Sequence, residues 1–179
     1  MLDFIVGYDF EEFKKYYSTL SDLHEFYINR TSRDPGEFKL GDDERFHVEN
    51  DIRHLIIWAD STEIVGHCIW HETSTDEMTP GDPRDDDDKE TLRTLFGGQK
   101  GNLVELHELW LKTEHRGKGY GHQFFDFFES FVARSGFDGI IHYSDHSAVI
   151  DICRKRNYKE AFLQSSGWYV FVIQAPIIK

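Results

Sequence analysis

The feature that most constrains the fold of this chain is a glycine-rich stretch in its second half, RGKGYG, residues Arg116–Gly121. An apolar run over residues 103–111 precedes it, and a run with helical spacing over 122–134 follows it. This order predicts a strand, a tight turn and a helix. Glycine permits positive φ angles and lets a ligand approach the backbone closely. Unpaired N–H groups at the start of the helix, with Arg116 and Lys118 beside them, therefore predict a phosphate site.

Three phosphate-binding patterns compete for these glycines. The nucleotide-hydrolase P-loop needs G-x-x-x-x-G-K-[ST], which does not occur in the sequence. The dinucleotide fingerprint needs G-x-G-x-x-G, but Gly121 comes one residue too early to be its third glycine. The pattern R-x-x-G-x-G fits fully, with Arg116, Gly119 and Gly121.

The wider string LWLKTEHRGKGYG, residues 109–121, resembles strand 4, the pyrophosphate loop and helix 3 of the GNAT superfamily of N-acetyltransferases. The resemblance implies an α/β fold (an α+β mixed sheet) in the order β-α-α-β-β-(inserted helix)-β-α-β-α-β-β. It implies acetyl-CoA as co-substrate, with the pyrophosphate on the loop and the pantetheine along the preceding strand. That strand must separate from its parallel neighbour to admit the thioester. The implied acyl-CoA-binding residues are Leu109, Trp110, Leu111, Arg116, Gly117, Lys118, Gly119, Tyr120, Gly121 and His146.

Length and charge limit the function classes further. The 179 residues suit one domain, 1–179, and the net charge of −13 argues against nucleic acid or an anionic membrane as partner. The charge suits a cationic acceptor, or serves solubility alone. Two cysteines make no disulfide scaffold, and the N-terminus has no signal-peptide pattern or apolar span, so we expect a cytoplasmic protein. A homodimer is compatible with this interpretation.

Apolar periodicity predicts the remaining elements. We expect a strand over 2–8, a helix after a capping box at Asp9, a second helix near Ser21, and a loop with at most a helical turn over 30–51. Strands over 54–59 and 63–71 form a hairpin. Beyond the glycine-rich loop we expect a helix over 122–134, a strand over 137–143, and strands over 159–164 and 167–175. Between them we expect a helix capped by Asp145 or His146, with Ala148, Val149, Ile152 and Cys153 inward.

An insertion over residues 72–102 separates the hairpin from the strand before the loop. Asp82-Pro83 can begin a helix there, with Asp85–Asp88 in its first turns and Gly97-Gly98 at its end. Leu92, Leu95 and Phe96 give this helix an apolar stripe. The acidic run is a solvated face or, alternatively, a lip that attracts the substrate.

Acyl transfer to an amine requires a group that takes a proton, because an alkylammonium has a reference pKa near 10.4. Candidates on the strand before the loop are Glu108, then Glu105 and His107. A charged residue in a central strand is costly to bury without a task or a partner.

The family's second signature places a tyrosine where Cys153 stands, so the usual acid for the departing thiolate is missing. Tyr143, Cys153 or solvent could serve instead, although a cysteine on an apolar helix face usually belongs to the core. The histidine pairs 67/71 and 142/146 lack acidic ligands at matched spacing, so no metal is expected. The sequence thus predicts an acyl-CoA-dependent N-acyltransferase that moves acetyl directly to a primary amine of a small molecule or protein. The alternative is a non-catalytic acyl-CoA-binding or sensing domain.

Overall fold

The computed structural model describes residues 2–6, 19–31, 38–40, 46–48, 54–61 and 63–175. They fall into two compact units. Unit 1 comprises Met1–Ile69 and Leu109–Arg116, and unit 2 comprises Trp70–Glu108 and Gly117–Lys179. The prediction that residues 1–179 form one domain stays a prediction.

Unit 1 is built on antiparallel strands. β1 (Leu2–Val6) pairs with β4 (His54–Asp60), from Leu2 opposite Asp60 to Val6 opposite Ile56. The first residues of β5 (Glu63–Thr73) and the last of β8 (Leu103–Leu111) continue the strand order. The other elements are α2 (Leu20–Thr31), β2 (Phe38–Leu40), β3 (Phe46–Val48) and the 3-10 turn η1 (Thr113–His115).

Unit 2 carries the strand order β5-β8-β9-β11-β10, and the whole sheet reads β1-β4-β5-β8-β9-β11-β10. β8 and β9 (Gly139–Ser144) are parallel, whereas β9, β11 (Trp168–Gln174) and β10 (Lys159–Leu163) are antiparallel to one another in turn. The helices of unit 2 are α3 (Asp86–Phe96), α4 (Tyr120–Arg134) and α5 (Ser147–Lys155), and a short pair, β6 (Glu77–Thr79) and β7 (Asp82–Pro83), precedes α3.

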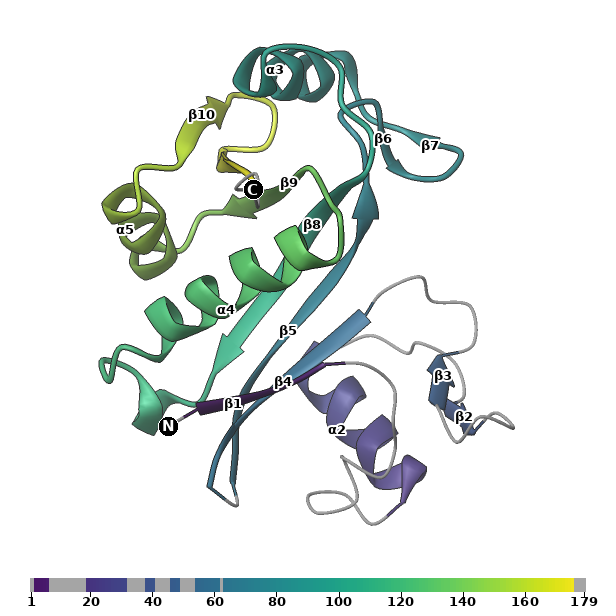
Figure 1. The fold of residues 1–179 in the computed structure, drawn as a ribbon, viewed down its shortest axis with the longest axis vertical. Helices are drawn as coiled ribbons and strands as arrows, with labels where there is room; N and C mark the ends of the chain where they lie inside the picture. The colour runs from purple at the N-terminus through teal and green to yellow at the C-terminus, as the bar shows by residue number, and fades with distance from the viewer. Residues whose placement is uncertain are drawn as a thin grey trace. The chain divides into compact units, whose positions relative to one another are not determined.

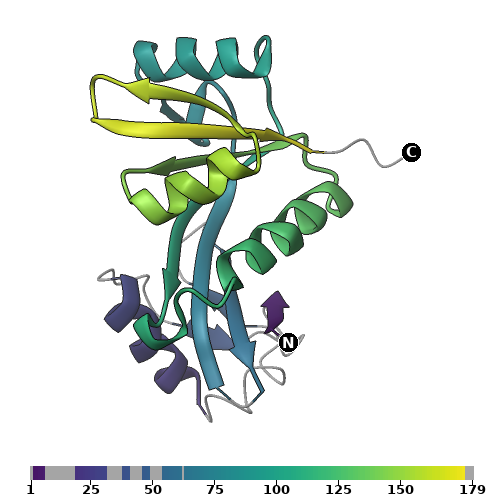
Figure 2. The same cartoon turned by 90° about the vertical axis from the view of Figure 1, so that its left-hand side faces the viewer.

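The two faces of the unit 2 sheet are covered by different helices. α3 lies against one face, beside the β10–β11 hairpin (Figures 1 and 2), and buries Leu92 and Phe96 there. The sheet residues in this core cluster are Leu103, Ile141, Leu163, Val170 and Val172. α4 contacts the opposite face through aromatic rings, with Phe128 against Trp70 and Phe125 against His142. The inserted helix is therefore part of the hydrophobic core and not an appendage.

Most of the predicted elements are confirmed, including the mixed sheet and the inserted helix with its apolar stripe. Three details were wrong. Asp82-Pro83 belongs to β7, and the helix begins at Asp86 because the Asp85 carboxylate accepts from the Asp88 N–H. The segment 30–51 contains strands β2 and β3. Ala148 is exposed, and Ile150 is buried in its place beside Cys153.

The capping box at Asp9 and the helix predicted after it lie outside the described residues. Within the described part of the chain, the helices are too short or too polar to cross a membrane.

Candidate active site

The glycine-rich loop opens α4 with an uncovered backbone. Gly117 and Gly119 have φ angles of 77° and 80°, the left-handed region that glycine adopts at least cost. A Cβ at either position would meet no atom within 4 Å, so the space beside the backbone is open. Gly119 is the N-cap of α4 and provides no side chain to bind the first N–H groups of the helix. These donors, with the exposed Lys118, fit a phosphate group.

The parallel ladder of β8 and β9 ends before either strand does. Pairing runs from Leu103 opposite Gly139 to Leu106 opposite His142, although both strands continue beyond these residues. The buried imidazole of His142 donates from Nδ1 to the Leu106 carbonyl at 2.6 Å. Burial lowers the pKa of His142, so the ring is neutral. Its hydrogen bond uses the carbonyl of Leu106, the residue at which the ladder stops.

A buried arginine from the insertion lies beside this point. Arg84 Nη2 donates to Glu105 Oε2 at 3.1 Å, and Nη1 donates to Asp88 Oδ2 at 3.1 Å. The guanidinium also donates to the Tyr143 hydroxyl at 2.8 Å, to Thr73 Oγ1 at 2.6 Å and to the Ser74 carbonyl at 3.0 Å. The insertion thus places a fully hydrogen-bonded cation against a β8 carboxylate.

The pKa shifts follow from this arrangement. Burial alone would raise the pKa of Glu105, but the hydrogen bond with His107 and the charge of Arg84 outweigh it and lower the pKa. Burial opposes the charge of Arg84, yet Tyr143, Glu105 and Asp88 together raise its pKa. Burial raises the pKa of Tyr143, whose hydroxyl donates to Asp88 Oδ1 at 2.7 Å. Glu105 and Arg84 are therefore charged at neutral pH, and Tyr143 is a protonated phenol.

Two histidines flank the Glu105 carboxylate. His107 Nδ1 lies 3.4 Å from Oε1, and His71 Nε2 lies 3.9 Å from Oε2. His71 Nδ1 is 3.0 Å from the Glu72 carbonyl, and the two imidazole rings are 5.8 Å apart. β8 thus passes along one face from an apolar residue, Leu103, through the buried Glu105 to the half-exposed His107.

The other sequence-selected residues occupy different surroundings. Glu108 is half-exposed, two residues beyond the end of the ladder. Cys153 is fully buried, and burial raises the pKa of its thiol to about 12, which fits a core residue better than an acid. His146 is the N-cap of α5, one of the two alternatives considered, and its backbone N–H donates to Ser144 Oγ.

Four of the sequence-selected acyl-CoA residues belong to unit 1. Leu109, Trp110 and Leu111 are half-exposed on β8, and the Trp110 ring stacks on His67 with centroids 5.6 Å apart. Arg116 donates from Nε to the Leu111 carbonyl at 3.2 Å. The roles of these residues, like those of the loop, stay predictions.

Two groups among the described residues bring three metal-ligand atoms within 4.8 Å of one another: His71 with Glu105 and His107, and Glu63 with Glu114 and His115. A cation already contacts one carboxylate of each group: Arg84 contacts Glu105, and Lys112 Nζ contacts Glu63 at 2.5 Å. Positive charge at both carboxylates disfavours a metal ion. The expectation of no metal stays a prediction.

Sequence reasoning missed Arg84 and misjudged Asp88. The acidic run divides: Asp85 caps α3, Asp86 and Asp87 are exposed, and Asp88 is buried against Arg84. Two signals could have found the pair. Arg84 and Asp88 have i, i+4 spacing, and Glu105 in mid-strand required a partner.

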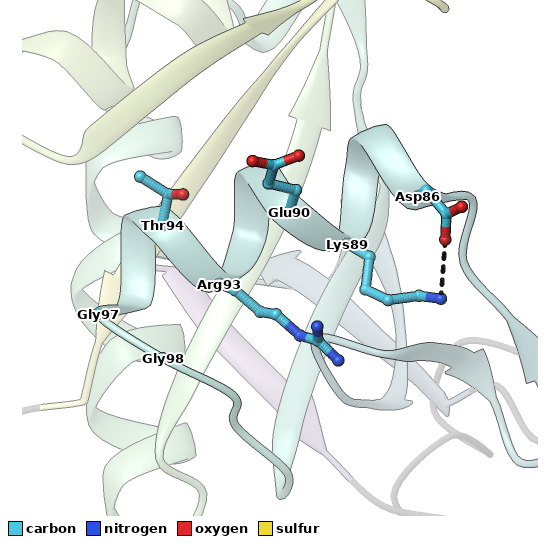
Figure 3. A pocket seen from close by; sticks show the side chains of 7 residues that line it. All are labelled: Asp86, Lys89, Glu90, Arg93, Thr94, Gly97 and Gly98. Atoms are coloured by element: carbon cyan, nitrogen blue, oxygen red, sulfur yellow. Dashed lines mark hydrogen bonds and ion pairs between the residues drawn. The ribbon is translucent and has the colours of Figure 1, made fainter.

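The outer side of α3 carries a surface hollow lined by polar and glycine residues (Figure 3). Its cations are already paired there, Lys89 with Asp86 at 3.3 Å and Arg93 with Asp76 at 2.7 Å. This solvated face is distinct from the buried side, where Arg84 and Asp88 lie.

Comparisons with known proteins identify the family of this chain. The Acetyltransferase (GNAT) family model matches residues 16–149, whereas no curated protein matches the chain. Among solved structures, a protein from Desulfovibrio desulfuricans assigned to the GNAT family shares 9% identity and superposes with a TM-score of 0.58, covering 98% of this chain and 100% of that one.

Two further structures show the same fold at low identity. Arabidopsis thaliana NAA60, in complex with a bisubstrate analogue, has 13% identity and a TM-score of 0.53, with 98% and 100% coverage. A mutant of the AtaT toxin, bound to the AtaR antitoxin C-terminus and acetyl-CoA, has 11% identity and a TM-score of 0.53, with 97% and 93% coverage. Since the family model spans most of the sequence and the fold is shared, this chain belongs to the GNAT family of acetyltransferases.

Proposed function

We propose that this protein transfers an acetyl group from acetyl-CoA to a primary amine by direct attack of the amine on the thioester. The observation that carries the proposal is the β8–β9 ladder, which stops at Leu106 and His142 while both strands continue. In the same unit, the open glycine loop begins α4. The first feature supplies a stretch of β8 backbone beyond its ladder with β9 for a pantetheine arm, and the second supplies donors for a pyrophosphate.

Acetyl-CoA would be held by the glycine-rich loop and by residues of β8 and α5. The backbone donors of Gly117–Gly121 would bind the pyrophosphate, and each charge-assisted hydrogen bond contributes roughly 1.5–3 kcal/mol. Lys118 adds a positive charge on the exposed loop. Leu109–Leu111 and His146 would bind other parts of the co-substrate.

The acceptor would be an amine that is cationic in solution. The net charge of −13 favours the approach of such a molecule. Glu108, half-exposed beyond the ladder end, is the carboxylate we assign to the acceptor site, where it would hold the ammonium by charge. Replacement by glutamine should raise the KM for the amine about tenfold and leave acetyl-CoA affinity unchanged, whereas an unchanged KM would remove this assignment.

The first experiment measures the release of free CoA from acetyl-CoA in the presence of a panel of primary amines and lysine peptides. We expect turnover on at least one amine. Acetyl-CoA binding without turnover on the panel would instead favour the non-catalytic domain. One observation favours that alternative: Tyr143 is hydrogen-bonded to Asp88 and Cys153 is buried, so neither sequence-selected acid is suited to protonate the leaving thiolate.

The second experiment tests the loop. Gly119→Glu places a bulky acid at a φ of 80° and should abolish acetyl-CoA binding in calorimetry. Gly81→Glu is the matched control, because Gly81 has a φ of 83° and equally open surroundings. Both variants carry a similar backbone cost, about 1–2 kcal/mol. Equal acetyl-CoA affinity in the two variants would refute the phosphate assignment.

A further inference from the structure

Arg84, His71, Glu105 and His107 form a charged cluster on the α3 side of β8, and His107 is its most exposed member. The exposed fraction of the side chain is 1% for Arg84, 4% for His71 and 5% for Glu105, but 23% for His107. A substrate can therefore meet His107 directly, whereas Glu105 can influence a substrate only through its neighbours.

The two oxygens of Glu105 are divided between these neighbours. Oε2 accepts from Arg84 at 3.1 Å and faces His71 at 3.9 Å, while Oε1 faces His107 Nδ1 at 3.4 Å. A carboxylate opposite Nδ1 favours the tautomer that carries hydrogen on Nδ1, which leaves the lone pair on Nε2. Active-site hydrogen bonds are often long before substrate binds, so 3.4 Å is compatible with this pairing.

Chemistry also separates the roles of the two residues. The lowered pKa of Glu105 keeps it charged and makes it a weak proton acceptor. An imidazole, with an ordinary pKa of about 6.5, is better matched to proton transfer near neutral pH.

We propose that His107 Nε2 accepts the proton of the acceptor ammonium, with Glu105 and Arg84 as positioning residues that hold the ring. This proposal rests on the proposed function. The ammonium gives one proton to Nε2, and the freed nitrogen lone pair forms a bond to the thioester carbonyl carbon. The C–S bond then breaks with its electron pair on sulfur. The nitrogen gives its second proton to the thiolate, and His107 returns its proton to solvent.

The charged side chain nearest the His107 ring is that of Glu105, which in turn pairs with Arg84. Arg84 offsets one of two carboxylates, so Arg84, Asp88 and Glu105 together leave one net negative charge. Among the described residues, Glu105 on β8, His71 on β5 and His142 on β9 interact with the ring. Behind Glu105 lies Arg84, which binds Tyr143 on β9 and Asp88 in α3.

The kinetic test compares His107→Gln with the parent and with His54→Gln, a control at the start of β4. We expect kcat to fall by roughly 10²–10⁴ and the acidic limb of the pH–rate profile to disappear in His107→Gln alone. Acetyl-CoA affinity should stay within about twofold of the parent, which shows that the fold is retained. An unchanged limb and rate would overturn the proposal.

A second measurement needs no turnover. The His107 ring resonance, identified in NMR spectra by its loss in His107→Gln, is titrated in the parent and in Glu105→Gln. Loss of the neighbouring negative charge should move the titration midpoint to lower pH. An unchanged midpoint would show that Glu105 does not position His107. If the midpoint moves but no amine is acetylated, the proposed function fails while the Glu105–His107 pairing stands.

Discussion

Replacement of Arg84 by methionine should strongly destabilise unit 2. The side chain is 1% exposed and bonds two carboxylates, a phenol, a hydroxyl and a carbonyl. Methionine fills a similar volume without charge, so Glu105 and Asp88 lose the cation that offsets them. Removing one partner of a buried ion pair costs about 3–5 kcal/mol. For a chain of this length, that corresponds to a fall in Tm of about 6–20 °C.

Urea unfolding followed by tryptophan fluorescence at pH 7 measures this cost. The matched control is Arg93→Met in the same insertion, where the arginine is 44% exposed and pairs with Asp76 at 2.7 Å. An exposed pair contributes about 0–1 kcal/mol, so the control should change the free energy of unfolding little. The triple variant Arg84→Met, Asp88→Asn, Glu105→Gln should recover part of the loss, because it buries no unpaired charge.

The pH dependence gives this prediction a sign. The pKa of Glu105 in the folded parent lies below its ordinary value of 4.5. The pairing therefore stabilises fully above the unfolded pKa and is lost as pH falls through the folded pKa. Without Arg84, burial raises the pKa of Glu105. Glu105 then becomes protonated as pH falls, and this removes the cost of burying an unpaired carboxylate. The difference in the free energy of unfolding between the parent and Arg84→Met should therefore become smaller towards pH 4. Equal costs for the Arg84 and Arg93 variants at pH 7 would refute this reasoning.

Three further outcomes are expected. Leu92→Ala, in the core beneath α3, should lower the free energy of unfolding in urea by about 2–5 kcal/mol, whereas a loss under 1 kcal/mol would mean that the inserted helix is not core. Gly139→Ala should lower the free energy of unfolding by about 1–3 kcal/mol, because its Cβ would lie 2.6 Å from the Ile173 carbonyl oxygen. Gly121→Ala meets only the tip of Ile152 and should lower it by less than about 1 kcal/mol. The reverse order in thermal unfolding would contradict the packing. Cys68 and Cys153 are buried with raised pKa values, so a thiol reagent should label them only in urea, and rapid labelling of the native protein would contradict their burial.

Much of the site could be predicted from local sequence. The alternation of apolar residues located the strands, and the glycine pattern located the loop before α4, because both depend on short-range geometry. The inserted helix was also predictable. Its N-cap is Asp85 and not Asp82, because the Asp85 carboxylate reaches the Asp88 N–H. Helix boundaries depend on such single hydrogen bonds, which propensity does not resolve.

The sequence by itself determined the family, the loop and the strand that carries the candidate proton acceptors, since each is encoded within about a dozen consecutive residues. Only the tertiary structure decided which of these side chains are buried and with whom. Arg84 and Glu105 are 21 positions apart, and Asp88 and Tyr143 are 55 apart. Their pairing depends on how the insertion packs on the sheet. A buried charge takes its role from its partners, and that is why the positioning role that we propose for Glu105 depends on Arg84 beside it.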